Sequence, residues 1–179
     1  MRIIVISDTH GRPSLIEKII EAQPDAKDIF FLGDLIKDIE DMPFMYPSRN
    51  FHIVSGNCDY GSTYKTADAV TVGGKRILFT HGHAYSVKSG RGRLLEWAKS
   101  EKADIVLYGH THVAKTEYAD GVLFVNPGSP TCPREGRSSY AVIDIEPNGI
   151  MPVIIMVNES LNLQVSTNNN HYKRIGGKK

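Results

Sequence analysis

Short apolar runs alternate with polar, helix-like segments through the first part of the chain. Four of these runs predict buried strands: residues 3–6, 29–32, 51–54 and 105–108. A helix is predicted over residues 14–22, because Pro13 precedes Ser14 and Glu17 follows Ser14 by three residues, which is the spacing of a capping box. A second helix is predicted over residues 91–101, where apolar side chains recur on one side.

Three tight turns between short strands are predicted, one in the first part of the chain and two after residue 108, where the pattern changes to antiparallel strands. Gly73-Gly74, Asp120-Gly121 and Pro147-Asn148-Gly149 each separate two apolar runs, as in β-hairpins. The flanking runs are, in order, residues 69–72 and 76–80, 115–118 and 122–125, and 140–145 and 150–157. An α/β pattern followed by hairpins predicts an α/β fold with a mixed sheet core that helices cover.

The chain has the size and composition of one globular domain. It has 179 residues, 41% of them hydrophobic, and its 21 basic and 20 acidic residues give a net charge of +1. This balance excludes a strongly basic nucleic-acid binder as the first interpretation. Residues 168–179 nevertheless hold four bases and no acid. We expect a domain over residues 1–158 and a basic, Asn-rich C-terminal extension over residues 159–179.

The N-terminal sequence and the cysteine content predict a cytoplasmic protein. The first apolar run ends at Ser7 and Asp8, whereas a signal peptide needs roughly 7–15 apolar residues. No apolar stretch approaches the roughly 20 residues of a membrane-spanning helix. Cys58 and Cys132 are too few for a disulfide framework and are predicted to be reduced thiols.

Polar motifs directly follow five of the predicted strands. They are Asp8-Thr9-His10, Gly33-Asp34, Gly56-Asn57-Cys58-Asp59, His81-Gly82-His83 and Gly109-His110-Thr111-His112. Each motif alone is typical of a turn or of a structural histidine. Because ligands bind at the carboxyl ends of the strands in open α/β sheets, five such strand ends together predict one shared site.

The side chains of these motifs suit a pair of divalent transition metals. Carboxylate, imidazole and amide oxygen bind Mn, Fe, Co, Ni or Zn without any thiolate. Two ions about 3.5–4 Å apart can clamp the attacking and leaving oxygens of a phosphoryl displacement. Together with Asp8, Asp34 and a bridging hydroxide, two such ions would carry a charge of about +1 and attract an anionic phosphate.

The motif series resembles that of the calcineurin-like metallophosphoesterases, which is Asp-x-His, Gly-Asp, Gly-Asn-His-Asp/Glu, His and Gly-His-x-His. The ordered match covers about residues 2–145. It is closest to the small bacterial and archaeal phosphodiesterase branch, which also carries His-Gly-His and the Asn-Pro-Gly-Ser loop found here at residues 126–129. The resemblance implies a four-layer αββα sandwich with two mixed β-sheets. It also implies a metal-dependent phosphodiesterase in which a metal-bridging hydroxide attacks the phosphorus of a small phosphate ester.

The resemblance further implies which residues hold two divalent metal ions. One ion is expected on Asp8, His10, Asp34 and His112, and the other on Asp34, Asn57, His81 and His110, so that Asp34 bridges them. Mn²⁺ is the expected metal, with Ni²⁺, Fe²⁺, Co²⁺ or Zn²⁺ as alternatives. The expected partner is a small phosphate-ester substrate. A homo-oligomer is expected, but neither a membrane nor a nucleic acid is expected as a partner.

Four residues are predicted to act on the substrate: Asp34, Asn57, Cys58 and His83. Cys58 stands where most of the superfamily has a histidine, which is thought to contact the phosphate and help protonate the leaving group. A thiol, with an ordinary pKa of about 8.5, offers no cationic donor at neutral pH. Esters with poor leaving groups are therefore expected to react slowly. For His83, a structural turn is an equal alternative.

Several alternatives stay open at this point. Asp59 is either an orienting partner of the site or a turn residue, and Arg134 is either a phosphate contact or a surface residue. The basic run at residues 88–93 is interpreted as a solvated loop rather than an anion site. The alternative function is a non-catalytic or weakly catalytic scaffold on the same fold. The complete set of metal-capable side chains favours the enzyme.

Overall fold

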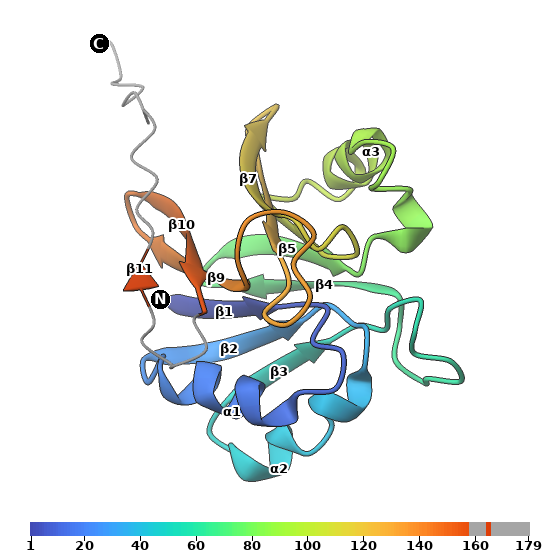
Figure 1. The fold of residues 1–179 in the computed structure, drawn as a ribbon. Helices are drawn as coiled ribbons and strands as arrows, with labels where there is room; N and C mark the ends of the chain where they lie inside the picture. The colour runs from blue at the N-terminus through green and yellow to red at the C-terminus, as the bar shows by residue number, and fades with distance from the viewer. Residues whose placement is uncertain (158–163, 166–179) are drawn as a thin grey trace.

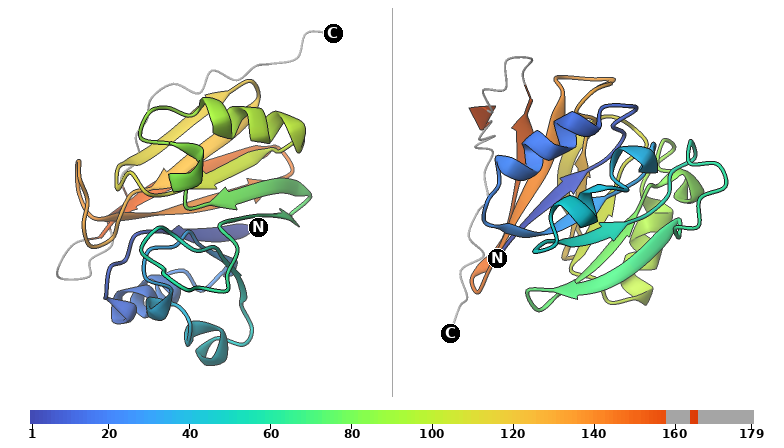
Figure 2. Two further views of the ribbon diagram at one scale, coloured as in Figure 1. Left: turned by 90° about the vertical axis from the view of Figure 1, so that its right-hand side faces the viewer. Right: turned by 90° about the horizontal axis from the view of Figure 1, so that it is seen from below.

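Two β-sheets packed face to face form the centre of the molecule (Figure 2). The computed structural model describes residues 1–157 and 164–165. One sheet has the order β11-β10-β9-β1-β2-β3 and consists of β1 (Arg2–Ile6), β2 (Ala26–Phe31), β3 (Asn50–Ile53), β9 (Ser139–Glu146), β10 (Gly149–Met156) and β11 (Gln164–Val165). The other has the order β4-β5-β6-β8-β7 and consists of β4 (Ala67–Val72), β5 (Lys75–Thr80), β6 (Ile105–Tyr108), β7 (Ala114–Ala119) and β8 (Val122–Pro127). Both sheets contain parallel and antiparallel neighbours.

Helices cover the outer faces of the two sheets. Helix α1 (Pro13–Glu21) and the short α2 (Met42–Met45) lie on one side of the stack, and α3 (Gly92–Ser100) lies on the other (Figure 1). Two 3-10 turns, η1 (Ile36–Asp38) and η2 (His83–Tyr85), follow β2 and β5. One apolar core fills the space between the sheets, and one further core lies under the helices on each side. This arrangement confirms the predicted αββα sandwich.

Parallel pairing places the carboxyl ends of the predicted motif strands side by side within each sheet. Strands β1, β2 and β3 run parallel, with Ile6 opposite Phe31 and Phe31 opposite Ile53. In the other sheet β5 and β6 run parallel, with Thr80 opposite Tyr108. The last residues of these strands are therefore neighbours within each sheet. All five motifs leave the strands at carboxyl ends, which is where α/β sheets bind ligands.

The beginning of α1 differs from the prediction. The helix starts at Pro13, its N-cap is Arg12, and no side chain caps it, so the predicted capping by Ser14 is wrong. Proline suits this position because its fixed φ matches the first helical turn and its missing N–H would have no partner there. The backbone N–H of Arg12 donates to Asp38 at 3.2 Å, so a carboxylate outside the helix takes over part of the capping role.

The strand predicted over residues 29–32 begins three residues earlier, at Ala26, and the other predicted elements lie within two residues of their observed bounds. All three predicted hairpin turns join antiparallel strands, and β11 adds Gln164–Val165 to the edge of β10. The remaining residues of the predicted extension, 159–163 and 166–179, lie outside the described part of the chain, as does residue 158. Within the described residues, no helix is long and apolar enough to cross a membrane. Cys58 and Cys132 are both free, as expected for reduced thiols.

Candidate metal centre

Seven predicted ligand side chains lie close together at the carboxyl ends of parallel strands in the two sheets. They come from the segments after β1, β2, β3, β5 and β6, and they are Asp8, His10, Asp34, Asn57, His81, His110 and His112. Asp8 and His81 are fully buried, and Asp34 is 2% exposed. Charged and polar groups are rarely buried in this way unless they are paired or bind a metal ion.

The first group of ligand atoms comes from Asp8, His10, Asp34 and His112. One ligand atom of each residue lies within 4.8 Å of those of the other three, a grouping that could hold a metal ion. Asp8 Oδ1 lies 3.2 Å from His112 Nε2, and the Nε2 atoms of His10 and His112 are 3.4 Å apart. These four residues are the set expected for one ion.

The second group is centred on His81. Its Nε2 atom lies 3.1 Å from Asn57 Oδ1, 3.1 Å from His110 Nδ1 and 3.5 Å from Asp34 Oδ2. These four residues are the set expected for the other ion. The Asp34 carboxylate belongs to both groups and lies between them.

Two backbone carbonyls set the direction of the histidine lone pairs. His81 Nδ1–H donates to the Leu32 carbonyl at 2.8 Å, and His112 Nδ1–H donates to the Cys132 carbonyl at 2.7 Å. A carbonyl only accepts, so in each ring the hydrogen sits on Nδ1 and the Nε2 lone pair faces the cluster. Metal-binding histidines are commonly oriented by such a contact through their other nitrogen.

The donor set fits a cation. The lone pair of His81 Nε2 faces the carbonyl oxygen of the Asn57 side chain, so two acceptor atoms point at each other. Asp8 Oδ1 is buried and has no hydrogen-bond partner among the described residues. Unpaired acceptors of this kind are costly when buried, and a bound cation would satisfy them. Oxygen and imidazole ligands without a thiolate match Mn, Fe, Co, Ni or Zn.

The pKa shifts of Asp8 and His112 reflect the attraction between this carboxylate and its neighbouring imidazoles, whereas the shift of His110 favours its neutral form. Contact with the Asp8 carboxylate raises the pKa of His112. Burial opposes the ionisation of Asp8, but His112 and His81 together lower the pKa of this carboxyl below its usual range. Burial, reinforced by His81, lowers the pKa of His110 to about 4, so this imidazole is neutral near pH 7. Protons and metal ions compete for such ligands.

Unusual backbone conformations aim several of these side chains. Asp8, His10, Asp34, His110 and His112 have φ values of +58°, +46°, +63°, +68° and +59°. The left-handed region costs a residue with a Cβ about 1–2 kcal/mol. Strained positions persist where the surrounding structure holds them, and they cluster at functional sites. The five values therefore support a functional role for this cluster.

Two glycines allow the motif loops after β2 and β3 to touch. Gly33 has a φ of +92°, and a Cβ there would overlap the backbone of Gly56. A Cβ on Gly56 would in turn overlap the carboxylate of Asp34. The glycine preceding Asp34 and the glycine preceding Asn57 are thus required by the close approach of two backbones.

Three polar side chains outside the motifs hold the Asp8-Thr9-His10 segment. Asp38 accepts hydrogen bonds from Thr9 Oγ1 at 2.6 Å and from the Gly11 backbone N–H at 2.8 Å. Ser129 Oγ donates to the Asp8 carbonyl at 2.7 Å, and Thr131 Oγ1 donates to the Thr9 carbonyl at 2.9 Å. Ser129 belongs to the Asn-Pro-Gly-Ser loop, which is one of the motifs that carry the family resemblance. No sequence signal pointed to Asp38 or Thr131.

Asp59 connects the two motif loops that carry Asp34 and Asn57. Its carboxylate accepts the backbone N–H of Asp34 at 2.9 Å and that of Gly56 at 2.7 Å. It also accepts the N–H groups of Leu35 and Ile36 at 3.0 and 2.8 Å. Of the two interpretations of Asp59, the structure supports the orienting partner.

Asp59→Asn is expected to lower metal affinity about 10–100-fold, the usual cost of changing a residue that orients a ligand. An amide has only one acceptor oxygen, so at least one of the N–H groups loses its partner. Calorimetric titration with Mn²⁺ would measure the change. Asp41→Asn is the matched control because Asp41 is exposed, and equal affinities in the two variants would contradict the orienting role.

The remaining candidates lie beside the cluster rather than in it. The Cys58 N–H donates to Asp34 Oδ1 at 2.9 Å. Partial loss of hydration around the Cys58 thiol, followed by the Asp34 carboxylate, raises its pKa to about 11. The His83 ring lies 5.4 Å from that of His81, and its buried Nδ1 has no partner among the described residues. Arg134 is exposed, and its backbone N–H donates to the His112 carbonyl at 3.1 Å.

Comparisons with known proteins agree with this fold. The family model for the calcineurin-like phosphoesterase superfamily domain matches residues 1–148. A probable metallophosphoesterase of Bacillus subtilis, YsnB, is 33% identical over 82% of this chain and 85% of its own length. The phosphodiesterase YfcE of Escherichia coli K12 is 26% identical over 94% of this chain and 99% of its own length.

A solved structure of a predicted phosphoesterase from Streptococcus pneumoniae TIGR4 has the same fold. It superimposes with a TM-score of 0.79 at 28% identity, covering 93% of each chain. The chain belongs to the calcineurin-like phosphoesterase superfamily. The predictions of this family, of its fold and of a phosphoric ester hydrolase are confirmed.

Proposed function

We propose that this protein is a phosphodiesterase that hydrolyses a small phosphate ester with two divalent metal ions. The metal that we propose is Mn²⁺. The observation that carries the proposal is the position of Asp34. Its buried carboxylate belongs to two separate groups of ligand atoms, one around Asp8 and His112 and one around His81. A carboxylate shared in this way can bridge two metal ions at the separation of about 3.5–4 Å that is typical of two-metal sites.

Each group would hold one ion. Asp8, His10, Asp34 and His112 would bind the first, and Asp34, Asn57, His81 and His110 the second. When bound, two such ions supply Lewis acidity at the phosphoryl oxygens and lower the pKa of a water molecule for in-line attack on phosphorus. Four neutral imidazoles and two carboxylates leave the ions with excess positive charge, which attracts an anionic ester.

The chain's own residues orient the ligands and limit proton transfer. The Leu32 and Cys132 carbonyls keep the Nε2 atoms of His81 and His112 free to bind. Asp38 and Asp59 hold the loops of Asp8, Asp34 and Asn57. The Cys58 thiol beside Asp34 stays neutral and is a poor proton donor. These features favour diesters with good leaving groups, such as nitrophenyl esters.

The scaffold alternative receives less support from the same side chains. A binding module on this fold does not need its metal ligands, yet all seven are present here and converge. We propose His83 as a substrate contact, because its ring lies beside those of His81 and His110 and its Nδ1 has no hydrogen-bond partner among the described residues. A cytoplasmic setting, a homo-oligomer and a domain boundary near residue 158 stay predictions.

Removal and return of metal tests the proposal. The chelator-treated protein is expected to lose hydrolysis of bis-p-nitrophenyl phosphate and to regain it with Mn²⁺, with about two ions bound per chain by elemental mass spectrometry. Ni²⁺, Fe²⁺, Co²⁺ and Zn²⁺ are tested in parallel. A folded, metal-loaded protein that is inactive with all five metals would contradict the enzyme and favour the scaffold.

A further inference from the structure

A cavity of about 480 Å³ lies directly beside the candidate metal centre. Its volume falls within the range of about 300–1,000 Å³ that is typical of small-molecule sites. One wall is the segment after Asp34, which contributes Leu35, Ile36 and Lys37. The other wall is the loop between β3 and β4, residues 58–64, which extends from the body of the molecule in Figure 1.

The two walls of this cavity are joined to each other and to the metal centre. Asp59 in the loop accepts the backbone N–H groups of Asp34, Leu35 and Ile36 in the opposite wall. The loop is closed at its base, where the Ser55 N–H donates to the Lys65 carbonyl at 2.8 Å. The cavity is therefore held in a defined shape.

Cys58 places the cavity next to the reacting phosphate. It lines the cavity, while its backbone N–H donates to Asp34 Oδ1 and its sulfur accepts from Asn57 Nδ2 at 3.4 Å. A phosphate held between Asp34 and Asn57 would have one ester group directed past Cys58.

Another cavity, of about 210 Å³, is lined in part by Thr111, which lies between two predicted ligands. The Thr111 hydroxyl already accepts a hydrogen bond from Asn126 Nδ2 at 3.0 Å.

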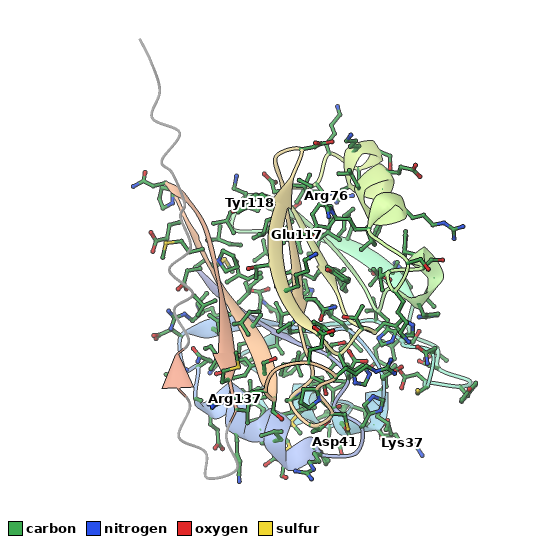
Figure 3. The ribbon with its side chains drawn as sticks, turned by 45° about the horizontal axis from the view of Figure 1, so that its top comes forward. Lys37, Asp41, Arg76, Glu117, Tyr118 and Arg137 are labelled. Atoms are coloured by element: carbon green, nitrogen blue, oxygen red, sulfur yellow. The ribbon has the colours of Figure 1, made fainter. Side chains whose placement is uncertain are left out.

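Two tyrosines give the cavity its chemical character. Tyr60 is 94% exposed and Tyr64 is 40% exposed, and both line it. An exposed aromatic ring beside a polar site is a stacking surface for a planar ring, because such side chains offer large contact area at a low entropy cost. Lys37, which is labelled in Figure 3, and Glu40 also line the cavity and give the ring charged neighbours of both signs.

We infer that this cavity binds the alcohol part of the substrate and selects phosphate esters whose alcohol carries a planar aromatic ring, such as a nucleoside or an aryl group. The inference rests on the proposed function and names the substrate class of that same site. Tyr60 and Tyr64 are its specificity-determining residues. Stacking of a base on an aromatic side chain contributes about tenfold or more to affinity.

Paired ligands that differ only in the ring test the inference by calorimetric binding to the Mn²⁺-loaded full chain. AMP is compared with ribose 5-phosphate, and phenyl phosphate with methyl phosphate. The ring-bearing ligand of each pair is expected to bind about tenfold more tightly. Preference in the first pair alone would assign the cavity to nucleosides, and preference in the second as well to aromatic rings in general.

The double variant Tyr60→Ala/Tyr64→Ala is expected to bring both ratios close to one without changing the affinity for ribose 5-phosphate. Phe44→Ala is the matched control, because Phe44 is an aromatic residue that is 86% exposed and lies outside the cavity lining. The inference would be overturned if the two ligands of each pair bind the native protein with equal affinity, or if none of them binds. It would also be overturned if the affinity ratios of the double variant equal those of the native protein. A ring preference without metal-dependent hydrolysis would instead contradict the proposed function alone.

Discussion

Asp34→Asn is expected to lower metal-dependent hydrolysis of bis-p-nitrophenyl phosphate by about 10³-fold or more. A change in a residue that only orients a ligand typically costs about 10–100-fold, and Asp34 is a member of both ligand groups. The amide removes a negative charge between two proposed cations. It also replaces one of the two oxygens, which lie beside the Cys58 N–H and His81 Nε2, with an N–H₂ group that has no lone pair to offer a cation.

The cause of that loss can be separated from misfolding. Circular dichroism and the thermal midpoint report the fold, and elemental mass spectrometry reports the ions bound per chain. The variant is expected to stay folded and to bind less metal. Asp41→Asn provides the control, since it removes a carboxylate from an exposed position and is expected to keep full activity. An Asp34→Asn protein with native metal content and activity within about tenfold of native would refute the shared-carboxylate scheme.

The position of the site was predictable because two sequence patterns agree. Apolar runs at strand length fixed the positions of β1, β5 and β6 to within one residue, and the polar motifs begin where those runs end. Parallel pairing then brings the carboxyl ends to one edge. The ligand side chains converge because of this topology, and the spacing of the motifs along the chain contributes nothing to it. For the same reason the motifs were informative only as a set.

The geometry within the site was not predictable from the same patterns. Asp38 lies in a short 3-10 turn that has no apolar periodicity, yet it anchors Thr9 and Gly11. The positive φ values of Asp8 and His110 contradict local preference, since residues with a Cβ avoid this region. Only contacts between segments far apart in the sequence stabilise such conformations. The predicted capping of α1 by Ser14 was wrong for a related reason: the helix begins one residue earlier, and a distant carboxylate, that of Asp38, holds its N-cap residue Arg12.

Cys58→His is expected to raise the hydrolysis of alkyl and nucleotide esters about 10²-fold, while nitrophenyl esters gain less than about tenfold. The native thiol, with a pKa of about 11, cannot act as a cationic donor. An imidazole has an ordinary pKa of about 6.5, and it would stand beside the carboxylates of Asp34 and Asp59, which favour its protonated form. Cys58 is exposed and lines a cavity, so the larger ring has room.

The dependence on the leaving group makes this prediction specific. A nitrophenolate leaves without a proton near neutral pH, whereas an alkoxide does not, so general acid assistance matters more as the leaving group becomes more basic. Across a series of aryl methyl phosphates, the fall of log kcat/KM with the pKa of the phenol is expected to be less steep in Cys58→His than in the native protein. Cys58→Ser is the control, because a hydroxyl is also neutral and leaves the slope unchanged. The gain is expected to fade as the pH rises above the imidazole pKa, since the donor form is then lost. Equal gains for all leaving groups would show that position 58 acts on binding and takes no part in proton transfer.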